Sequence, residues 1–384
     1  MRTGPRGYVT VAAIEGADGY MREAGAADPL DRMISTLRMG DGVDTGIANG
    51  IEAAVHRWRT LPRAQVAGRT GSGRTTVARA LGLQPGVETA PVDEPGFPDP
   101  VLDADIVVYV LASTPSPGDR RVLATLTPQR SLLVLNKADA IGTGWSDAVT
   151  AADRYSRQFG LPTFPMVGSL AARTISGALR EGDLELLRRH AHAGSALAVS
   201  ADSFLSPAAG TDTAERAELL DQWDLYGVSC VLATLDREPD LSPQTVLQIL
   251  HTVSGVEPAA KLLGVRYQQA ISRRAGVLVD ELTRLAARAV PRGQSRARAL
   301  ITEYLDTDEA RWLGLCGGLA DPEVAHLAAG YPRPEPEDAD DALARAVRWR
   351  AVASGEMSPA ARRAAIKVHN GYVRMWERMS SVGL

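Results

Sequence analysis

Residues 64–81 read AQVAGRTGSGRTTVARAL, and this stretch decides how the rest of the chain is interpreted. The apolar run Ala64–Ala67 predicts a strand, and Thr76–Leu81 predicts a helix. Glycines between them let successive backbone N–H groups turn inward around phosphate oxygens at the start of a helix. The alternative is a glycine-rich turn that binds nothing. The residues expected to form this phosphate loop are Gly68, Gly71, Ser72, Gly73, Arg74, Thr75 and Thr76.

Two side chains of the loop indicate its ligands. The pattern is G-x4-G-K-[ST] with Arg74 in place of the lysine. Arg74 can supply a cation, although its planar fork is bulkier than an ammonium group and is not equivalent to it. Thr75 is placed to ligate Mg²⁺ beside a β-phosphate. We therefore expect a nucleotide together with Mg²⁺.

An acidic turn follows at Asp93-Glu94-Pro95-Gly96. The spacing D-x-x-G fits a carboxylate, Asp93, that reaches Mg²⁺ through water, and a glycine, Gly96, whose N–H meets a γ-phosphate. Thr75 and Asp93 are therefore the predicted metal residues. Taken alone, the four residues 93–96 are better explained as a plain Pro-Gly turn.

The most specific pattern is Asn136-Lys137-Ala138-Asp139, which closes the predicted strand Leu132–Leu135. Asp139 can accept hydrogen bonds from the ring N–H and the exocyclic amine of guanine, a donor pair that adenine lacks. Lys137 can lie along the base plane, and Asn136 can brace the neighbouring loops. The alternative is an ordinary surface loop. After the last predicted strand, a backbone N–H at Ser169 or Leu170 could meet the guanine O6.

Strand and helix signals alternate between residues 63 and 200, which indicates βαβ units and a parallel sheet. The predicted strands are Ala64–Ala67, Ile106–Ala112, Leu132–Leu135 and Phe164–Val167, and the predicted helices are Thr75–Leu81, Arg120–Leu126, Ser146–Phe159 and Ile175–His190. Later helices are expected over Ala214–Leu225, Pro243–Val253, Ala259–Ala289, Ala297–Leu305, Asp341–Val352 and the C-terminal segment from Ser358-Pro359.

The expected fold class is therefore α/β, a three-layer domain with a mainly parallel sheet plus an all-α helical region. The expected domains are an N-terminal helical segment at 1–60, a nucleotide domain at 61–200 and a helical domain at 201–384.

Composition excludes several classes of protein. Lys and Arg number 42 against 46 Asp and Glu, a net charge of −4, which argues against a nucleic-acid partner. Two cysteines cannot build a disulfide framework or a four-thiolate zinc site. No apolar run approaches the roughly 18 residues of a membrane span. We expect a cytoplasmic protein, and peripheral contact with a membrane stays open.

The motifs G-x4-G-R-T, D-x-x-G, N-K-A-D and G-S-L, each at a strand end within residues 64–171, resemble the translation-factor-related class of P-loop GTPases. The flanking helices resemble, more narrowly, the actinobacterial dynamin-like GTPases, including the isoniazid-inducible type. Leu225–Val228 and Gly264–Leu285 resemble, in residue pattern, the helical region of those GTPases. The resemblance implies a P-loop GTPase fold, GTP or GDP with Mg²⁺, and a homo- or hetero-oligomer with a related GTPase.

The sequence departs from this class in the parts that hydrolyse GTP. The interval from Thr75 to Asp93 is too short for switch I, its Mg²⁺-binding threonine and an extra strand. Dynamin-like loops carry glutamine and serine where this chain has Thr70 and Gly71, and Phe97 after Gly96 cannot orient water. No catalytic residue is assigned, and hydrolysis is expected to be slow or absent.

The predicted function is thus a guanine-nucleotide-binding protein, a weak or degenerate GTPase with a helical effector or assembly region. The alternative is a non-hydrolysing pseudo-GTPase that acts as a structural or dimerisation partner of an active paralogue. An ATP-dependent kinase or transporter ATPase is disfavoured by Asn136–Asp139.

Overall fold

A computed structural model describes residues 28–39, 45–112, 114–193, 199–289, 295–328, 331 and 333–382. Residues 1–27 of the expected N-terminal segment lie outside the described residues. The chain divides into two compact units. Of the described residues, 63–266 form the first unit, and 28–62 with 267–382 form the second. The division falls inside helix α13, Val256–Ala289.

Four parallel strands form the sheet of the first unit, in the spatial order β1-β2-β3-β4. All residues of β2 and β3 are buried, as expected for a parallel sheet covered on both faces. The predicted α/β class with a mainly parallel sheet is confirmed, and each predicted strand is present. The strands are β1 (Ala64–Gly68), β2 (Ile106–Leu111), β3 (Ser131–Asn136) and β4 (Thr163–Met166).

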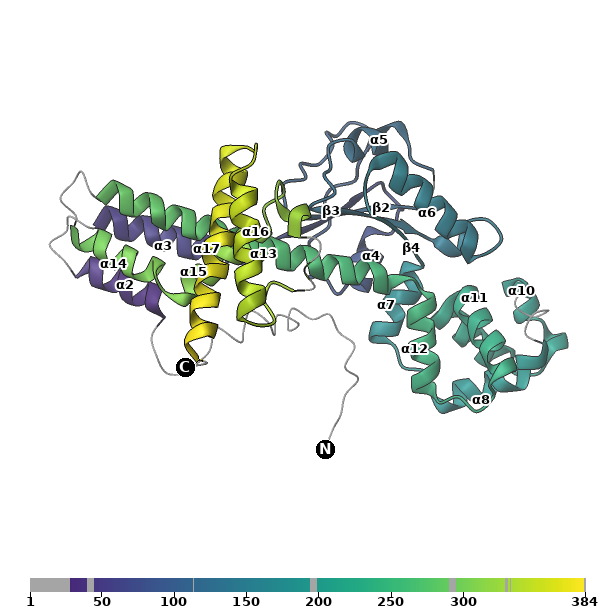
Figure 1. Cartoon of the computed structure of the whole chain (residues 1–384). Helices are drawn as coiled ribbons and strands as arrows, with labels where there is room; N and C mark the ends of the chain where they lie inside the picture. The colour runs from purple at the N-terminus through teal and green to yellow at the C-terminus, as the bar shows by residue number, and fades with distance from the viewer. Residues whose placement is uncertain are drawn as a thin grey trace. The chain divides into compact units, whose positions relative to one another are not determined.

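Helices cover the sheet on both faces (Figure 1). Helices α5 (Pro117–Leu123) and α6 (Trp145–Phe159) pack their apolar residues onto one face, against alternate side chains of β2 and β3. On the other face lie α4 (Arg74–Ala80) and α7 (Gly168–Ser176), which contact each other. Because the strands are parallel, the loops that follow them emerge at one edge, where ligands bind in open α/β sheets.

An extended segment runs beside the outer edge of β1. Val66 donates its N–H to Val87 O, at 2.9 Å, and accepts one from Thr89 N, at 3.0 Å. Further along, Val92 N donates to Gly68 O, at 3.1 Å. Residues 87–92 therefore prolong the sheet by short backbone pairing and lead directly into Asp93.

The rest of the first unit is a helical cluster around the buried side chains of Trp223, Leu232 and Leu250. It is built from α8 (Glu181–His190), η3 (Ala191–Ala193), α10 (Ala201–Phe204), η4 (Pro207–Ala209), α11 (Thr213–Arg237), α12 (Pro243–Val253) and the start of α13. The turn between α12 and α13 is fixed to the sheet, because Val167 N donates to Ser254 O, at 2.8 Å.

Two helix predictions in this unit were wrong. The single helix expected at Ile175–His190 is two helices, because Gly177 takes an extended ψ of 162° and ends α7. Helix α11 continues twelve residues beyond the expected Leu225, to Arg237, after a kink at Asp224, whose φ is 54°. Arg173 of α7 donates to the carbonyls of Asp221 and Gln222 beside this kink.

The second unit is entirely helical in its described part. Helices α2 (Pro29–Arg38) and α3 (Thr45–Arg59) bury their apolar faces with those of α13 and α14 (Ser295–Leu305), beside which they lie in Figure 1. A second core surrounds Trp349 and Tyr372. Its elements are α15 (Asp308–Leu319), η6 (Ala325–Ala328), α16 (Ala339–Ala353) and α17 (Pro359–Val382).

Helix α15 was not predicted, because three of its twelve residues are glycine, a poor helix former. The structure gives the reason for one of these. A Cβ placed on Gly317 would lie 2.3 Å from the Cα of Gly276 in α13, so the two backbones touch. Only glycine permits this approach.

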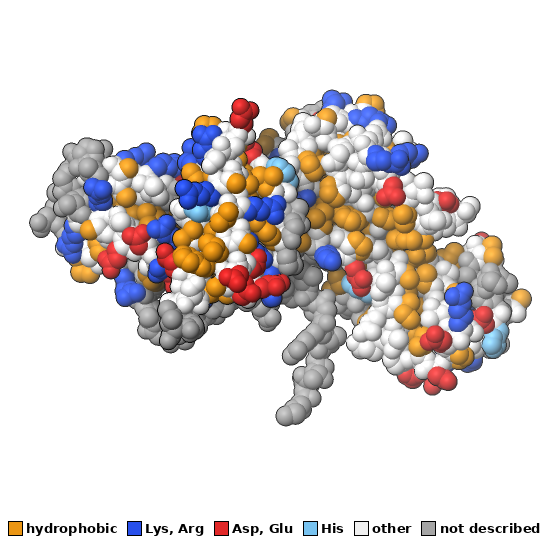
Figure 2. Space-filling view, in the orientation of Figure 1, with side chains coloured by type: hydrophobic (Ala, Val, Ile, Leu, Met, Phe, Trp, Pro, Cys, Tyr) orange, Lys and Arg blue, Asp and Glu red, His pale blue; other side chains and the backbone are white. Residues whose placement is uncertain are grey.

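The described helices and the face drawn in Figure 2 bear on membrane contact and on charge. Among the described helices, none combines the length and the apolarity that crossing a bilayer requires. The face seen in Figure 2 mixes acidic with basic side chains. No single sign of charge covers that face.

Candidate functional site

The predicted phosphate loop connects β1 to α4 and depends on its glycines. Gly68, Gly71 and Gly73 all have positive φ, at 150°, 76° and 89°. A Cβ on Gly73 would stand 2.2 Å from the Nδ2 of Asn136, and one on Gly68 would stand 2.5 Å from the carbonyl oxygen of Val110. The loop is therefore pressed against the ends of β2 and β3, and both positions require glycine.

Asn136, the last residue of β3, joins two neighbouring loops. Its Nδ2 donates to Ser72 O at 2.9 Å, and its Oδ1 accepts from Gly168 N at 3.0 Å. The side chain is buried, and the residue is 3% exposed. This is the brace expected from the sequence: one amide fixes the phosphate loop and the start of α7 at the same edge of the sheet.

The two residues expected to meet the base follow directly. Lys137 has a left-handed backbone, with φ 56° and ψ 42°, and is exposed. Asp139 lies in the short 3-10 turn Ala138–Ala140 and is exposed as well. Its charge acts on Tyr226 of α11, whose pKa is raised mainly by burial, then by Cys230, and to a lesser degree by Asp139.

The residues Gly168-Ser169-Leu170 form the first turn of α7. Leu170 is 1% exposed and belongs to the apolar core of the helical cluster. Ser169 is half-buried. Only the backbone and the Ser169 side chain of this turn are therefore available to a ligand.

Segment 87–96 engages the phosphate loop through side chains. The guanidinium of Arg74 donates to Thr89 O at 2.7 Å. Thr70 donates its hydroxyl to the Oε2 of Glu94 at 2.9 Å. Thr75 is exposed and Thr76 is half-buried. The cation at the lysine position therefore faces a backbone carbonyl of this segment.

Asp93 is turned toward the start of α5. Its carboxylate accepts from the Ser116 hydroxyl at 3.3 Å and from Arg121 at 3.4 Å, and its backbone is left-handed, with φ 59°. Within the described residues it forms no hydrogen bond with Thr75. No group of three or more His, Cys, Asp or Glu residues suited to a metal ion occurs there either. The role of Thr75 and Asp93 as metal residues therefore stays a prediction.

Sequence reasoning missed the buried carboxylate of Asp119. It accepts from the Tyr109 hydroxyl at 2.7 Å and from Ser116 N at 2.8 Å, and the Arg69 guanidinium of the phosphate loop lies 4.0 Å away. Burial, followed by Asp119, raises the pKa of Tyr109. The signal was present in the sequence: Ser116-Pro-Gly-Asp119 forms a capping box at the start of α5.

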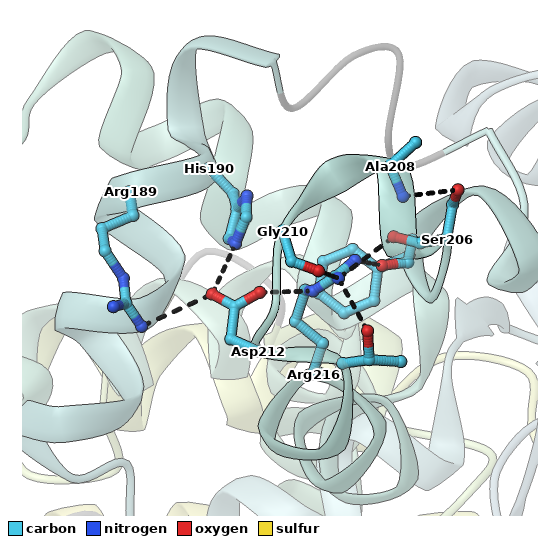
Figure 3. A network of polar contacts seen from close by, with 9 residues as sticks. Arg189, His190, Ser206, Ala208, Gly210, Asp212 and Arg216 are labelled. Atoms are coloured by element: carbon cyan, nitrogen blue, oxygen red, sulfur yellow. Dashed lines mark hydrogen bonds and ion pairs between the residues drawn. The ribbon is translucent and has the colours of Figure 1, made fainter.

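A second buried polar network lies in the helical cluster, and Figure 3 shows Asp212 at its centre. Its Oδ2 is 2.9 Å from His190 Nε2 and 3.5 Å from the guanidinium of Arg189, and its Oδ1 accepts from Arg216 Nε at 2.9 Å. The Arg216 side chain is completely buried. Its remaining N–H groups donate to the carbonyls of Phe204, Ser206 and Gly210 and to the hydroxyl of Thr213.

This network has a structural role. A buried guanidinium must have its donors satisfied, and here carbonyls of the segment before α11 satisfy them. His190, through Asp212, connects α8 to the same segment. The hydrogen bond from His190, and the charges around it, lower the pKa of Asp212.

The comparisons do not place the chain in a family. Neither the models of known protein families nor the curated proteins gave a match to this sequence.

Proposed function

We propose that this chain is a guanine-nucleotide-binding protein with a P-loop GTPase-like fold and a weak or degenerate capacity for hydrolysis. The narrower kinship with dynamin-like GTPases belongs to the same proposal. It would bind GDP or GTP at the edge of the sheet where the loops after β1, β3 and β4 meet.

The observation that carries the proposal is the position of Asn136. Its amide bonds to Ser72 in the phosphate loop and to Gly168 at the start of α7. Three separate sequence motifs are thereby held together at one edge of the sheet. An amide that joins the expected phosphate loop to the expected base-binding loop would give a nucleotide one continuous surface. Sequence motifs and three-dimensional contacts that agree in this way rarely do so by chance.

The residues fit a phosphate better than they fit a metal ion. Gly68, Gly71 and Gly73 have positive φ, the backbone conformation that lets successive N–H groups turn inward around an anion. Gly73 supplies no side-chain cap to α4, so the backbone N–H groups in the first turn of this helix can donate to an anion. Asp93 already has Ser116 and Arg121 as partners, and no residue is assigned to hydrolysis.

The same contacts favour a second candidate, the non-hydrolysing pseudo-GTPase that acts as a structural or dimerisation partner of an active relative. Arg74 is held by Thr89 O and Asp93 by Arg121, so both groups that would assist a γ-phosphate already have partners. The two candidates share nucleotide binding and differ only in turnover.

Calorimetry on the full chain with GDP, GTP and ATP tests binding. We expect GDP to bind and ATP to bind much more weakly. Asp139→Ala should weaken GDP about 100-fold, because it removes two hydrogen bonds to a charged acceptor. Asp153→Ala, which removes an exposed carboxylate from α6, is the control and should leave binding unchanged. Absence of binding at millimolar nucleotide, or equal affinity for ATP and GTP, would contradict the proposal.

Phosphate release separates the two candidates. Slow turnover supports the degenerate GTPase, and binding without turnover supports the pseudo-GTPase. Repeating the assay with lipid vesicles tests the dynamin-like resemblance. An unchanged rate and no sedimentation with vesicles would count against that narrower kinship.

A further inference from the structure

Segment 87–96 contacts the phosphate loop and places the carboxylate of Glu94 on it. Three contacts hold it there: Val92 N to Gly68 O, Arg74 to Thr89 O, and Thr70 to Glu94. The first two involve backbone groups of the segment. The third places the carboxylate of Glu94 directly on a hydroxyl of the phosphate loop, 2.9 Å away.

We propose that Glu94 makes this site selective for a guanine nucleoside diphosphate over the triphosphate. This inference rests on the proposed function, since it concerns the same site. Glu94 lies two residues before Gly96, in the turn whose glycine N–H is expected to meet a γ-phosphate. A third phosphate that reached this glycine would therefore approach the Glu94 carboxylate, which is hydrogen-bonded to Thr70.

The cations around the loop are directed at other partners than Glu94. Arg74 faces Thr89 O, and the guanidinium of Arg69 is directed at the buried Asp119, 4.0 Å away. Arg121 is shared between Asp93 and Asp99, at 3.4 and 3.6 Å. No Lys or Arg in the described ranges forms an ion pair with Glu94.

A third phosphate would meet this carboxylate or displace it. Displacement breaks the bond to Thr70 and leaves the carboxylate beside the added charge. A diphosphate ends before that position and avoids both costs. A like charge several ångströms away near a protein surface changes affinity by about tenfold, and added salt reduces the effect.

The test compares GDP with GTP by calorimetry, for the wild type and for Glu94→Gln, in full-length protein. We expect wild type to bind GDP about tenfold or more tightly than GTP, and Glu94→Gln to bring the ratio close to one by improving GTP. Glu88→Gln is the matched control. It removes a carboxylate from the same segment, one that forms no hydrogen bond with the phosphate loop among the described residues, and should keep the wild-type ratio.

The salt dependence of the wild type gives a second measurement that needs no variant. The preference for GDP should shrink as ionic strength rises. Equal affinity of the wild type for both nucleotides would overturn the inference, and so would a GDP preference that Glu94→Gln or salt leaves unchanged. Failure of GDP and GTP to bind either protein would instead overturn the proposed function itself, and this inference with it.

Discussion

Replacing Asn136 by alanine should loosen the nucleotide edge of the sheet without unfolding the second unit. The change removes both hydrogen bonds of the buried amide, each of which contributes about 1 kcal/mol net. It also leaves Ser72 O and Gly168 N without their partner, at a cost of about 1–3 kcal/mol for each group that water does not reach. Partial entry of water into the vacated space offsets some of this cost. We expect a total loss of about 2–4 kcal/mol in the stability of the first unit.

Hydrogen exchange followed by mass spectrometry measures this loss locally, which matters because a chain with two compact units need not unfold in one step. Peptides from β1–α4 and from α7 should exchange about 30- to 1000-fold faster in Asn136→Ala. Peptides from α15 and α17 should not change.

Asn370→Ala is the control, because that asparagine is exposed on α17. Asn136→Asp adds a finer test. It keeps the acceptor for Gly168 N but sets an oxygen against Ser72 O. Exchange within twofold of wild type in Asn136→Ala would refute the reasoning and mean that the backbone alone holds these loops.

Two further predictions concern stability. Gly317→Ala should destabilise the second unit by about 3 kcal/mol, because its Cβ would lie 2.3 Å from Gly276 Cα. Urea unfolding of the full chain, followed by hydrogen exchange in peptides from α13 to α15, measures this loss. Gly46→Ala, in α3 with open space around it, is the control and should be neutral or slightly stabilising; equal midpoints for both variants would refute the close contact. Asp212→Asn should lower the urea midpoint of the helical cluster at neutral pH. Because His190 lowers the pKa of Asp212 below that of an aspartate in the unfolded chain, this contribution is complete above the unfolded-state pKa and is lost as pH falls through the lowered pKa. A gap between wild type and variant that persists at pH 2 would contradict this assignment.

The sheet could be predicted from the sequence because its strands are short apolar runs, each followed by a recognisable turn. The run at 132–135 and the N-K-A-D pattern together were enough to expect both the strand and the bracing role of Asn136. Spacing along the chain determines these features, and spacing is visible in a sequence.

The contacts of Arg74 and Asp93 could not be predicted in this way. Each depends on which partner a flexible side chain finds across the fold, and a motif specifies only the residue type. Arg74 contacts Thr89 O because segment 87–96 pairs with β1, and the sequence of that segment does not predict the pairing. The kink at Asp224 was hidden for a similar reason, since the donor that stabilises it, Arg173, is far away in sequence.

The order in which the second unit is assembled has a consequence for synthesis on the ribosome. Its apolar core joins Leu30 and Ile51, which precede the first unit in the sequence, to Leu282 and Ile301, which follow it. The growing chain therefore exposes the apolar faces of α2 and α3 long before α13 and α14 are synthesised. Residues 63–266, in contrast, can fold as one continuous stretch. Closing so long a loop adds little entropy cost once the partners exist. The delay itself is the hazard: during translation these two helices are where a chaperone would be needed most.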